Sequence, residues 1–395
     1  MFFNHINPNP KWAPIHNPKT PSRVTLLNTK NWRQSMKRQL TGLILAATMA
    51  MSGTAFAFEQ PPIYQLKPKD QVLILGDSTT AGGVQMGGYV RLVDQAQNEQ
   101  RPDQGIVVRG MGWSGATMRD TLNGIPGLKP LFAKPAAPTV VIVNYGLNDS
   151  KEGEANVPAF TECVRKVVEA LQQYKVTVIL CTPTTWGGLT QTKSYAEAVR
   201  TVAAELKIPL IDLYATHADH ITSNTKDGQR LPGTNPTTDG THLSMVGETL
   251  SASAILQGLG LKPTWQRYQL RLSMGRVKKL SSKGKIKVVP DQVSNVQSFT
   301  NFDWTNMAYG KGFEYLPNVA DIPNPGEWHA NWPTKQASFA PGTKVTLTFE
   351  PDAEHTFVGW ESKGGPVITE TSPSLTITMD RHQWIFCVAK PSGGK

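Results

Sequence analysis

Five residues of the chain have the chemistry needed to attack a carbonyl group and hold the resulting negative charge. A serine hydroxyl such as that of Ser78 is a weak nucleophile and needs a neighbouring base. His242 can be that base, and Asp239, three residues earlier, can orient its ring. The backbone N–H of Gly115 and the side-chain amide of Asn148 are candidate donors to a developing oxyanion. Together these residues predict acyl transfer through a serine nucleophile.

Ser78, Gly115 and Asn148 each follow a short apolar run that predicts a buried β-strand. The runs cover residues 71–75, 105–108, 139–144, 176–181 and 209–213. Apolar residues at helical spacing lie between them or after them, over 157–174, 195–206 and 245–259. This alternation predicts an α/β fold in three layers, α/β/α, with a parallel sheet. Because ligands bind at the carboxyl ends of parallel strands, we expect the three residues to meet at that edge.

Four sequence blocks carry a resemblance to a known family. They are Gly76-Asp77-Ser78, Gly112-Trp113-Ser114-Gly115, Gly146-Leu147-Asn148-Asp149 and Asp239-Gly240-Thr241-His242. In this order they resemble the SGNH/GDSL hydrolases, a family of serine esterases and lipases with a flavodoxin-like fold. The resemblance covers about residues 70–260. It implies no metal and no organic cofactor, and it assigns the roles of nucleophile to Ser78, base to His242, orienter to Asp239, and oxyanion donors to Ser78, Gly115 and Asn148.

Other residues near the predicted strand ends have two interpretations. Gly112 is an alternative to Gly115 as the second oxyanion donor. Trp113 and Trp186 are candidates for the substrate pocket, where an aromatic ring can stack on a sugar, although packing beneath a loop is the alternative for each. His217 and His220 follow the fifth run, and we expect them in a solvated loop.

The sequence changes character after residue 261. Alternation of apolar and polar residues at period two covers 285–289, 344–349 and 374–379, and six of the ten tryptophans lie in this part. It predicts a smaller, β-rich domain over 262–395 with an irregular insertion at about 298–332. Residues 339–348, 357–361 and 375–380 are similar to the internalin B-repeat modules, which are β-grasp-like units of exported proteins. That resemblance implies contact with a cell wall or glycan.

The first 57 residues have the composition of a leader. Residues 36–57 combine a basic start, an apolar stretch and Ala55-Phe56-Ala57, as in a signal peptide, and translation starts at Met1 or at Met36. Residues 1–57 hold seven of the 40 Lys and Arg residues and no Asp or Glu, so the remaining chain has a net charge of +3. The basic charge therefore gives no reason to expect nucleic acid as a partner. We expect no transmembrane anchor, because the apolar stretch is short.

The remainder divides into a linker over 58–69, the hydrolase domain over 70–261 and the β-rich module. The three cysteines have no metal-ligand spacing, and Cys163 and Cys181 are either free thiols or a pair. The whole sequence predicts an exported bacterial serine esterase, periplasmic or extracellular, acting on small esters or on O-acyl (acetyl) groups of polysaccharide. The alternatives are a lipase or lysophospholipase, and an adhesive or scaffold protein with a vestigial hydrolase domain.

Overall fold

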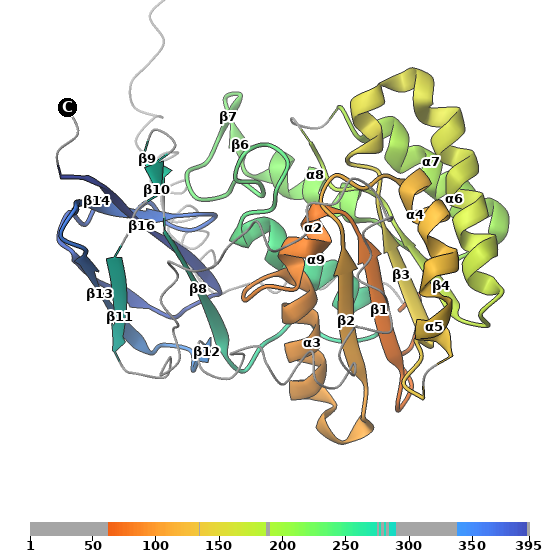
Figure 1. Ribbon diagram of the computed structural model, residues 1–395, viewed down its shortest axis with the longest axis horizontal. Helices are drawn as coiled ribbons and strands as arrows, with labels where there is room; N and C mark the ends of the chain where they lie inside the picture. The colour runs from red at the N-terminus through yellow and green to blue at the C-terminus, as the bar shows by residue number, and fades with distance from the viewer. Residues whose placement is uncertain are drawn as a thin grey trace, which may run out of the picture. The chain divides into compact units, whose positions relative to one another are not determined.

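The predicted strands of the hydrolase region form one parallel sheet in the computed structural model of the protein (Figure 1). The structure describes residues 62–133, 135–186, 190–274, 276–277, 280–281, 284–289 and 338–392. The predicted leader and the predicted insertion lie outside these residues. The strands are β1 (Gln71–Gly76), β2 (Val107–Gly112), β3 (Val140–Asn144), β4 (Thr177–Cys181) and β5 (Leu210–Ile211). Their order in the sheet is β2-β1-β3-β4-β5. The strands after β2 are added on the other side of β1, so the strand order reverses there, as in doubly wound folds.

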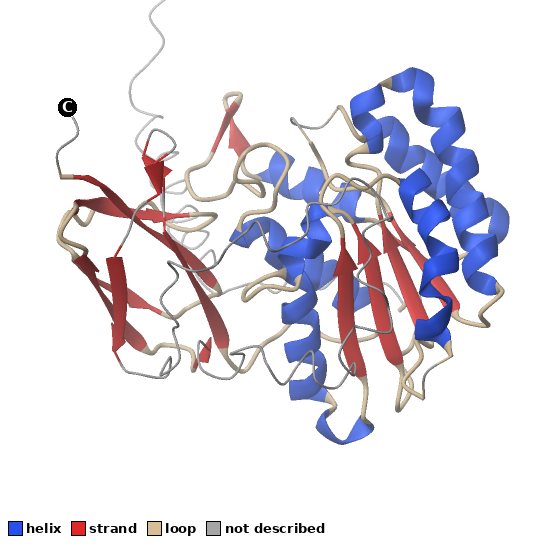
Figure 2. Cartoon of the chain, in the orientation of Figure 1, coloured by secondary structure: helices blue, strands red, loops and turns tan. Residues whose placement is uncertain are grey.

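Helices cover both faces of this sheet (Figure 2). The longer helices are α3 (Tyr89–Gln100), α6 (Val157–Gln172), α7 (Lys193–Leu206), α8 (Leu213–Ser223) and α9 (Met245–Gly258), and the shorter ones are α2 (Ser78–Gly83), α4 (Met118–Gly124) and α5 (Lys129–Phe132). Single 3₁₀ turns form η1 (Pro102–Gln104), η2 (Ile125–Leu128), η3 (Asp149–Glu152) and η4 (Glu154–Asn156). Helices α4, α6 and α7 pack on one face, and α3, α8 and α9 pack on the other. The predicted three-layer α/β/α fold is confirmed.

Strand β1 shows why the sheet is covered on both sides. Leu73 and Leu75 point into the core beneath α6 and α7, whereas Val72 and Ile74 point into the core beneath α3 and α9. Alternate residues of a strand face opposite sides, so an apolar run must be buried on both. Each such side chain stabilises the fold by about 1.5–3 kcal/mol through its burial.

The second strand differs most from its prediction. It was predicted over 105–108, but β2 begins at Val107 and continues to Gly112. The turn η1 and the left-handed Gly105 (φ 64°) occupy the residues before it. Arg109 is a charged residue in the middle of β2, so it interrupts the apolar run by which a strand is predicted. Its guanidinium donates hydrogen bonds to Gln71 and to the carbonyl of Ala136.

The region after residue 262 is β-rich, as predicted. Its strands are β8 (Tyr268–Met274), β9 (Arg276–Val277), β10 (Leu280–Ser281), β11 (Gly284–Val289), β12 (Ser338–Phe339), β13 (Lys344–Pro351), β14 (His355–Ser362), β15 (Ser374–Thr378) and β16 (Gln383–Pro391). They form a sheet in the order β11-β13-β15, a second in the order β12-β8-β16-β14, and the ribbon β9–β10. Buried side chains such as Phe339, Leu347 and Ile385 form a shared core. We call this region the β module.

The described residues after Gln60 belong to one compact unit, within which polar contacts join the β module to the hydrolase region. The backbone N–H of Gly87 donates to Gln269 Oε1 (2.6 Å), and the indole N–H of Trp265 donates to the carbonyl of Leu92 (2.8 Å). A boundary near residue 262 remains a prediction. Cys163, Cys181 and Cys387 are free thiols. Within the described residues, no helix is long and apolar enough to cross a membrane.

Candidate active site

Ser78 lies at the carboxyl end of β1, as the first residue of α2. Asp77 caps this helix, since its Oδ1 accepts hydrogen bonds from the backbone N–H and the hydroxyl of Thr79, both at 2.8 Å. Asp77 is buried whereas Ser78 is partly exposed. The cap therefore fixes the turn and leaves the serine accessible.

Asp239 and His242 lie on the loop that precedes α9. The imidazole Nδ1 of His242 is 2.7 Å from Asp239 Oδ2, and the two side chains are 52% and 54% exposed. Asp239 Oδ1 also accepts the backbone N–H groups of Thr241 (3.0 Å) and His242 (2.8 Å). Burial raises the pKa of Asp239, but these hydrogen bonds outweigh it and hold the pKa below its usual value. Asp239 is therefore an ionised acceptor for the ring N–H of His242.

An electrostatic interaction connects this loop with the residue next to the serine. Burial raises the pKa of Asp77, while the charges of His242 and Lys151 work in the opposite direction. His242 and Lys151 thus act on the buried carboxyl that caps the Ser78 turn. No hydrogen bond joins Ser78 to His242 in the described part of the chain, and in free enzymes such bonds are often long.

The end of β2 lies against the start of α2. Residues Gly76 and Gly112 are paired in the sheet, and the N–H of Trp113 donates to the carbonyl of Gly76 (3.0 Å). A Cβ on Gly112 would overlap the backbone nitrogen of Ala81, so only glycine permits this approach. Packing therefore accounts for Gly112. Gly115 is exposed, has φ +84° and has open space where a Cβ would be, which leaves its backbone accessible.

Asn148 is the predicted donor after β3, and its amide is held on both sides. Its Nδ2 donates to the carbonyl of Ala116 (2.9 Å), next to Gly115, and its Oδ1 accepts from Lys151 Nζ (2.7 Å). The side chain is buried. Asn148 therefore joins the loop after β2 to the turn η3.

Lys151 is the residue of this site that the sequence interpretation missed. Its ammonium group lies 2.7 Å from the oxygen of the Asn148 side chain and 5.4 Å from the centre of the Trp186 ring. A signal was present just after the third block, because side chains three residues apart lie on the same side of a 3₁₀ turn. Lys151 stands three residues after Asn148.

The remaining candidates lie in two environments. Trp113 and Trp186 are partly exposed, and Trp113 also packs against the core beneath α4 and α6.

His217 is fully buried, with its Nε2 3.0 Å from the hydroxyl of Ser251, and burial lowers its pKa to about 3. His220 Nε2 lies 2.8 Å from the carbonyl of Thr234. The two histidines therefore have structural partners, but His217 is in the core and not in the solvated loop that we expected.

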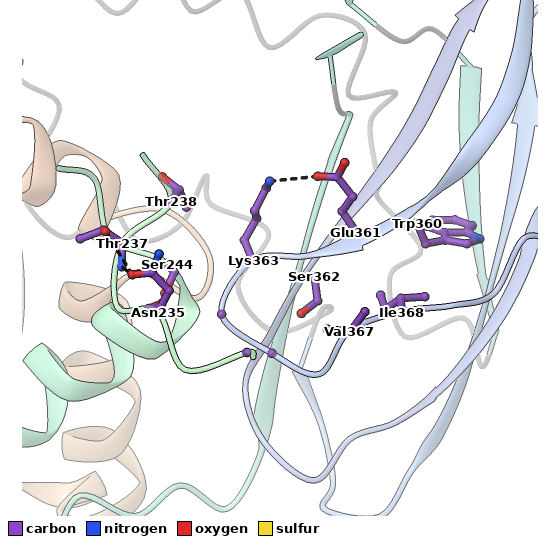
Figure 3. A pocket seen from close by; sticks show the side chains of 13 residues that line it. Asn235, Thr237, Thr238, Ser244, Trp360, Glu361, Ser362, Lys363, Val367 and Ile368 are labelled. Atoms are coloured by element: carbon purple, nitrogen blue, oxygen red, sulfur yellow. Dashed lines mark hydrogen bonds and ion pairs between the residues drawn. The ribbon is translucent and has the colours of Figure 1, made fainter. Parts of the chain in front are cut away.

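A cavity of about 350 Å³ lies between the loop that leads to Asp239 and the connection from β14 to β15 (Figure 3). Thr237, Thr238 and Ser244 line one side, and Glu361 and Lys363, which form an ion pair at 2.9 Å, lie on the other. The N–H of Met245 donates to the carbonyl of Lys363 (3.0 Å). Ser78, Asp239 and His242 do not line this cavity.

The hydrolase region offers hydrogen-bond donors and a base, and no metal site was found in the part of the chain that the structure describes. No group of three or more His, Cys, Asp or Glu side chains there is arranged to hold a metal ion. The site can take up a proton at His242 and donate hydrogen bonds from Asn148.

Comparisons with known proteins identify two regions of the chain. Residues 74–250 match the GDSL-like lipase/acylhydrolase family, and residues 330–385 match the divergent InlB B-repeat domain. No curated protein matches the chain significantly. Among solved structures, the acetyl xylan esterase AlAXEase is 23% identical over 47% of this chain and 97% of its own, with a TM-score of 0.42. Axe2, an acetylxylan esterase from Geobacillus stearothermophilus, is 23% identical over 51% of this chain and 100% of its own (TM-score 0.40).

A lipase/acylhydrolase from Enterococcus faecalis is also similar, at 26% identity over 49% of this chain and 98% of its own (TM-score 0.37). The family matches cover the two regions that the sequence separated. The chain therefore combines a divergent InlB B-repeat domain with a hydrolase domain that belongs to the GDSL-like lipase/acylhydrolase family of carboxylic ester hydrolases.

Proposed function

We propose that the protein is an exported serine esterase that removes O-acyl groups, principally acetyl, from carbohydrate. The observation that carries the proposal is the 2.7 Å contact between His242 Nδ1 and Asp239 Oδ2, in a domain that matches the GDSL-like lipase/acylhydrolase family. A neutral imidazole oriented in this way keeps its Nε2 free to accept a proton.

The reaction proceeds in two steps that conserve atoms and protons. Ser78 Oγ bonds to the ester carbonyl carbon while His242 Nε2 takes the hydroxyl proton. The oxyanion accepts hydrogen bonds from the N–H groups of Ser78 and Gly115 and from the Asn148 amide, and His242 protonates the leaving alcohol oxygen as the C–O bond breaks. Water then attacks the acyl-enzyme, with His242 as base, and releases the acid and Ser78.

The exposure of the acid–base pair supports a large, polar alcohol. Both Asp239 and His242 are more than half exposed, so a polymer chain can lie across the loop without entering a deep cavity. Trp186 is partly exposed beside Lys151, and an indole ring of this kind can pack against a sugar. The match of residues 330–385 to the divergent InlB B-repeat domain favours contact of the same molecule with a cell wall or glycan.

Loss of the nucleophile tests the reaction. The mature chain from Phe58 onward is assayed with p-nitrophenyl acetate, and Ser78→Ala should lower kcat at least a thousandfold. Ser223→Ala is the matched control, because Ser223 is exposed at the end of α8. A fluorophosphonate probe should give a mass-spectrometric adduct on Ser78 in the wild type. Hydrolysis by Ser78→Ala at the wild-type rate would refute the mechanism, and an unlabelled folded wild type would favour a vestigial domain.

The substrate class is tested separately. Acetylated xylan and lysophospholipid are offered to the same wild-type preparation, and release of acetate or fatty acid is measured. We expect acetate release with the larger kcat/KM. A larger kcat/KM on the phospholipid would replace the carbohydrate proposal with the lipase alternative while leaving the serine mechanism intact.

A further inference from the structure

Lys151 is a charged residue that the proposed mechanism does not use, yet it contacts the mechanism's side-chain oxyanion donor. Its Nζ lies 2.7 Å from Asn148 Oδ1, and its charge reaches the buried Asp77 that caps the nucleophile turn. The ammonium group lies 5.4 Å from the Trp186 ring centre, within the range of a cation–π contact. The side chain is thus held between Asn148 and an aromatic ring.

The two partners of Asn148 allow its amide only one orientation. A lysine ammonium group can only donate, so the side-chain oxygen must face Lys151. The carbonyl of Ala116 can only accept, so the amino group must face the loop after β2. One amino hydrogen is then bonded to Ala116, and the second remains for another acceptor. In the wild type, rotation of the amide by 180° would break the hydrogen bond to Lys151 as well as the one to Ala116. Without Lys151, only the bond to Ala116 would be lost, and the amide oxygen could turn toward the loop.

The contact also changes the strength of the donor. A hydrogen bond from an ammonium group to the amide oxygen polarises the amide and strengthens donation from its nitrogen, because connected hydrogen bonds reinforce one another. The positive charge near Asp77 also offsets a carboxyl that would otherwise repel a developing oxyanion. Both effects are larger when the substrate oxygen carries negative charge, which is the condition for faster chemistry without tighter binding.

We infer that Lys151 is a positioning residue, which fixes and polarises the Asn148 amide so that it donates its free hydrogen to the oxyanion. This inference rests on the proposed serine esterase function. It predicts an effect on kcat and little effect on KM. It also predicts that the effect of Lys151 depends on Asn148.

A double-mutant cycle tests the inference with p-nitrophenyl acetate. Lys151→Met should lower kcat about tenfold with KM changed less than twofold, and Lys151→Arg, which still donates, should recover most of the loss. Asn148→Ala should lower kcat by about two orders of magnitude. Adding Lys151→Met to Asn148→Ala should lower kcat less than twofold further. Lys166→Met is the matched control, since Lys166 is an exposed lysine on α6 that pairs with Glu162.

Two kinetic results would overturn the inference. One is a wild-type kcat for Lys151→Met, and the other is a full tenfold loss when that change is added to Asn148→Ala, which would mean that Lys151 acts without Asn148. An NMR measurement that needs no enzymatic activity distinguishes failure of this inference about Lys151 from failure of the proposed esterase function. In protein labelled with ¹⁵N-asparagine, the Asn148 side-chain amide signals should shift in Lys151→Met and stay in place in Lys166→Met. Unshifted signals in Lys151→Met would refute the contact even if the wild type hydrolysed no ester.

Discussion

The side chains of His242 and Asp239 are joined through Nδ1 and Oδ2 although both face solvent. One hydrogen bond contributes only about 0.5–1.5 kcal/mol, so this contact between exposed side chains needs further support to keep one geometry. That support comes from the second carboxylate oxygen of Asp239, which accepts two backbone N–H groups of the same loop. The loop therefore orients the acid, and the acid orients the base.

Asp239→Asn should lower kcat for p-nitrophenyl acetate by about two to four orders of magnitude, with KM little changed. The amide oxygen can still accept the loop N–H groups, but the amino group then faces Nδ1 and forces the wrong ring tautomer. Steady-state kinetics measures the effect. Asp227→Asn, in the exposed turn between β6 (Thr225–Lys226) and β7 (Gln229–Arg230), is the control. A loss below threefold in Asp239→Asn would contradict the role of Asp239.

Trp186→Leu should raise KM for acetylated xylan by up to about tenfold, the equivalent of the 0.5–1.5 kcal/mol expected of one aromatic contact. The small ester p-nitrophenyl acetate has no sugar, so its KM should stay the same. Trp186→Phe keeps a ring beside Lys151 and serves as the control. Equal changes in KM for both substrates in Trp186→Leu would count against a sugar contact.

Glu248→Gln should make the protein more stable at alkaline pH. Glu248 is buried, and burial raises its pKa to about 8 from 4.5, although the charge of Arg271 acts in the other direction. The folded chain thus binds this proton more tightly than the unfolded chain. The resulting stability is fully present below pH 4.5 and is lost as the pH rises through 8. The amide introduced by Glu248→Gln does not titrate, while its oxygen could still accept the N–H of Tyr89 (2.8 Å in the wild type).

Melting temperatures at pH 5, 7 and 9 test this prediction. The wild type should lose stability relative to Glu248→Gln across this range. Glu169→Gln, at an exposed position of α6, should follow the wild type. Parallel curves for the wild type and Glu248→Gln would show that Glu248 does not titrate in this window.

Gly364→Ala should destabilise the fold and disturb the loop that carries His242. Gly364 has φ +80°, and an added Cβ would lie 2.5 Å from Ser244 Oγ and 2.7 Å from the nitrogen of Val246. Gly342 has φ +82° and open space around an added Cβ, so Gly342→Ala isolates the backbone strain, which is about 1–2 kcal/mol. The clash should lower the free energy of unfolding of Gly364→Ala by about 1–3 kcal/mol more than the strain lowers that of Gly342→Ala.

Denaturant unfolding and kcat measure the two consequences. We expect a lower free energy of unfolding and a lower kcat for Gly364→Ala than for Gly342→Ala. Equal values for the two variants would mean that the β module does not influence the acid–base loop.

The sequence was sufficient to predict two local features near the candidate site, a strand and a side-chain contact. The run before Ser78 is apolar at nearly every position and could only be a covered strand, and Asp239 and His242 are close enough in sequence for one loop to pair them. Lys151 was missed because the pattern of the third block identifies Asn148 but not the residue that orients it. The helix α3 was missed because arginine, aspartate and glutamines interrupt its apolar positions.

Contacts between distant residues could not be predicted from one sequence. The bond from Gly87 to Gln269 joins residues 182 positions apart, and no local pattern marks either of them as a partner. The same is true of Met245 and Lys363, whose contact brings the β module to the start of α9.

The position of β16 determines when the sheet that contains β8 can be completed during synthesis. This strand ends at Pro391, near the C-terminus, yet it lies inside its sheet, parallel to β8 and antiparallel to β14. β8 is synthesised before β16, so the edge of β8 that pairs with β16 stays unpaired until β16 has been synthesised. The hydrogen bond from the N–H of Met245 to the carbonyl of Lys363 also forms only after residue 363 has been synthesised. A chain stopped just before Gln383 would thus contain every proposed catalytic residue and still lack the strand that holds the β module together.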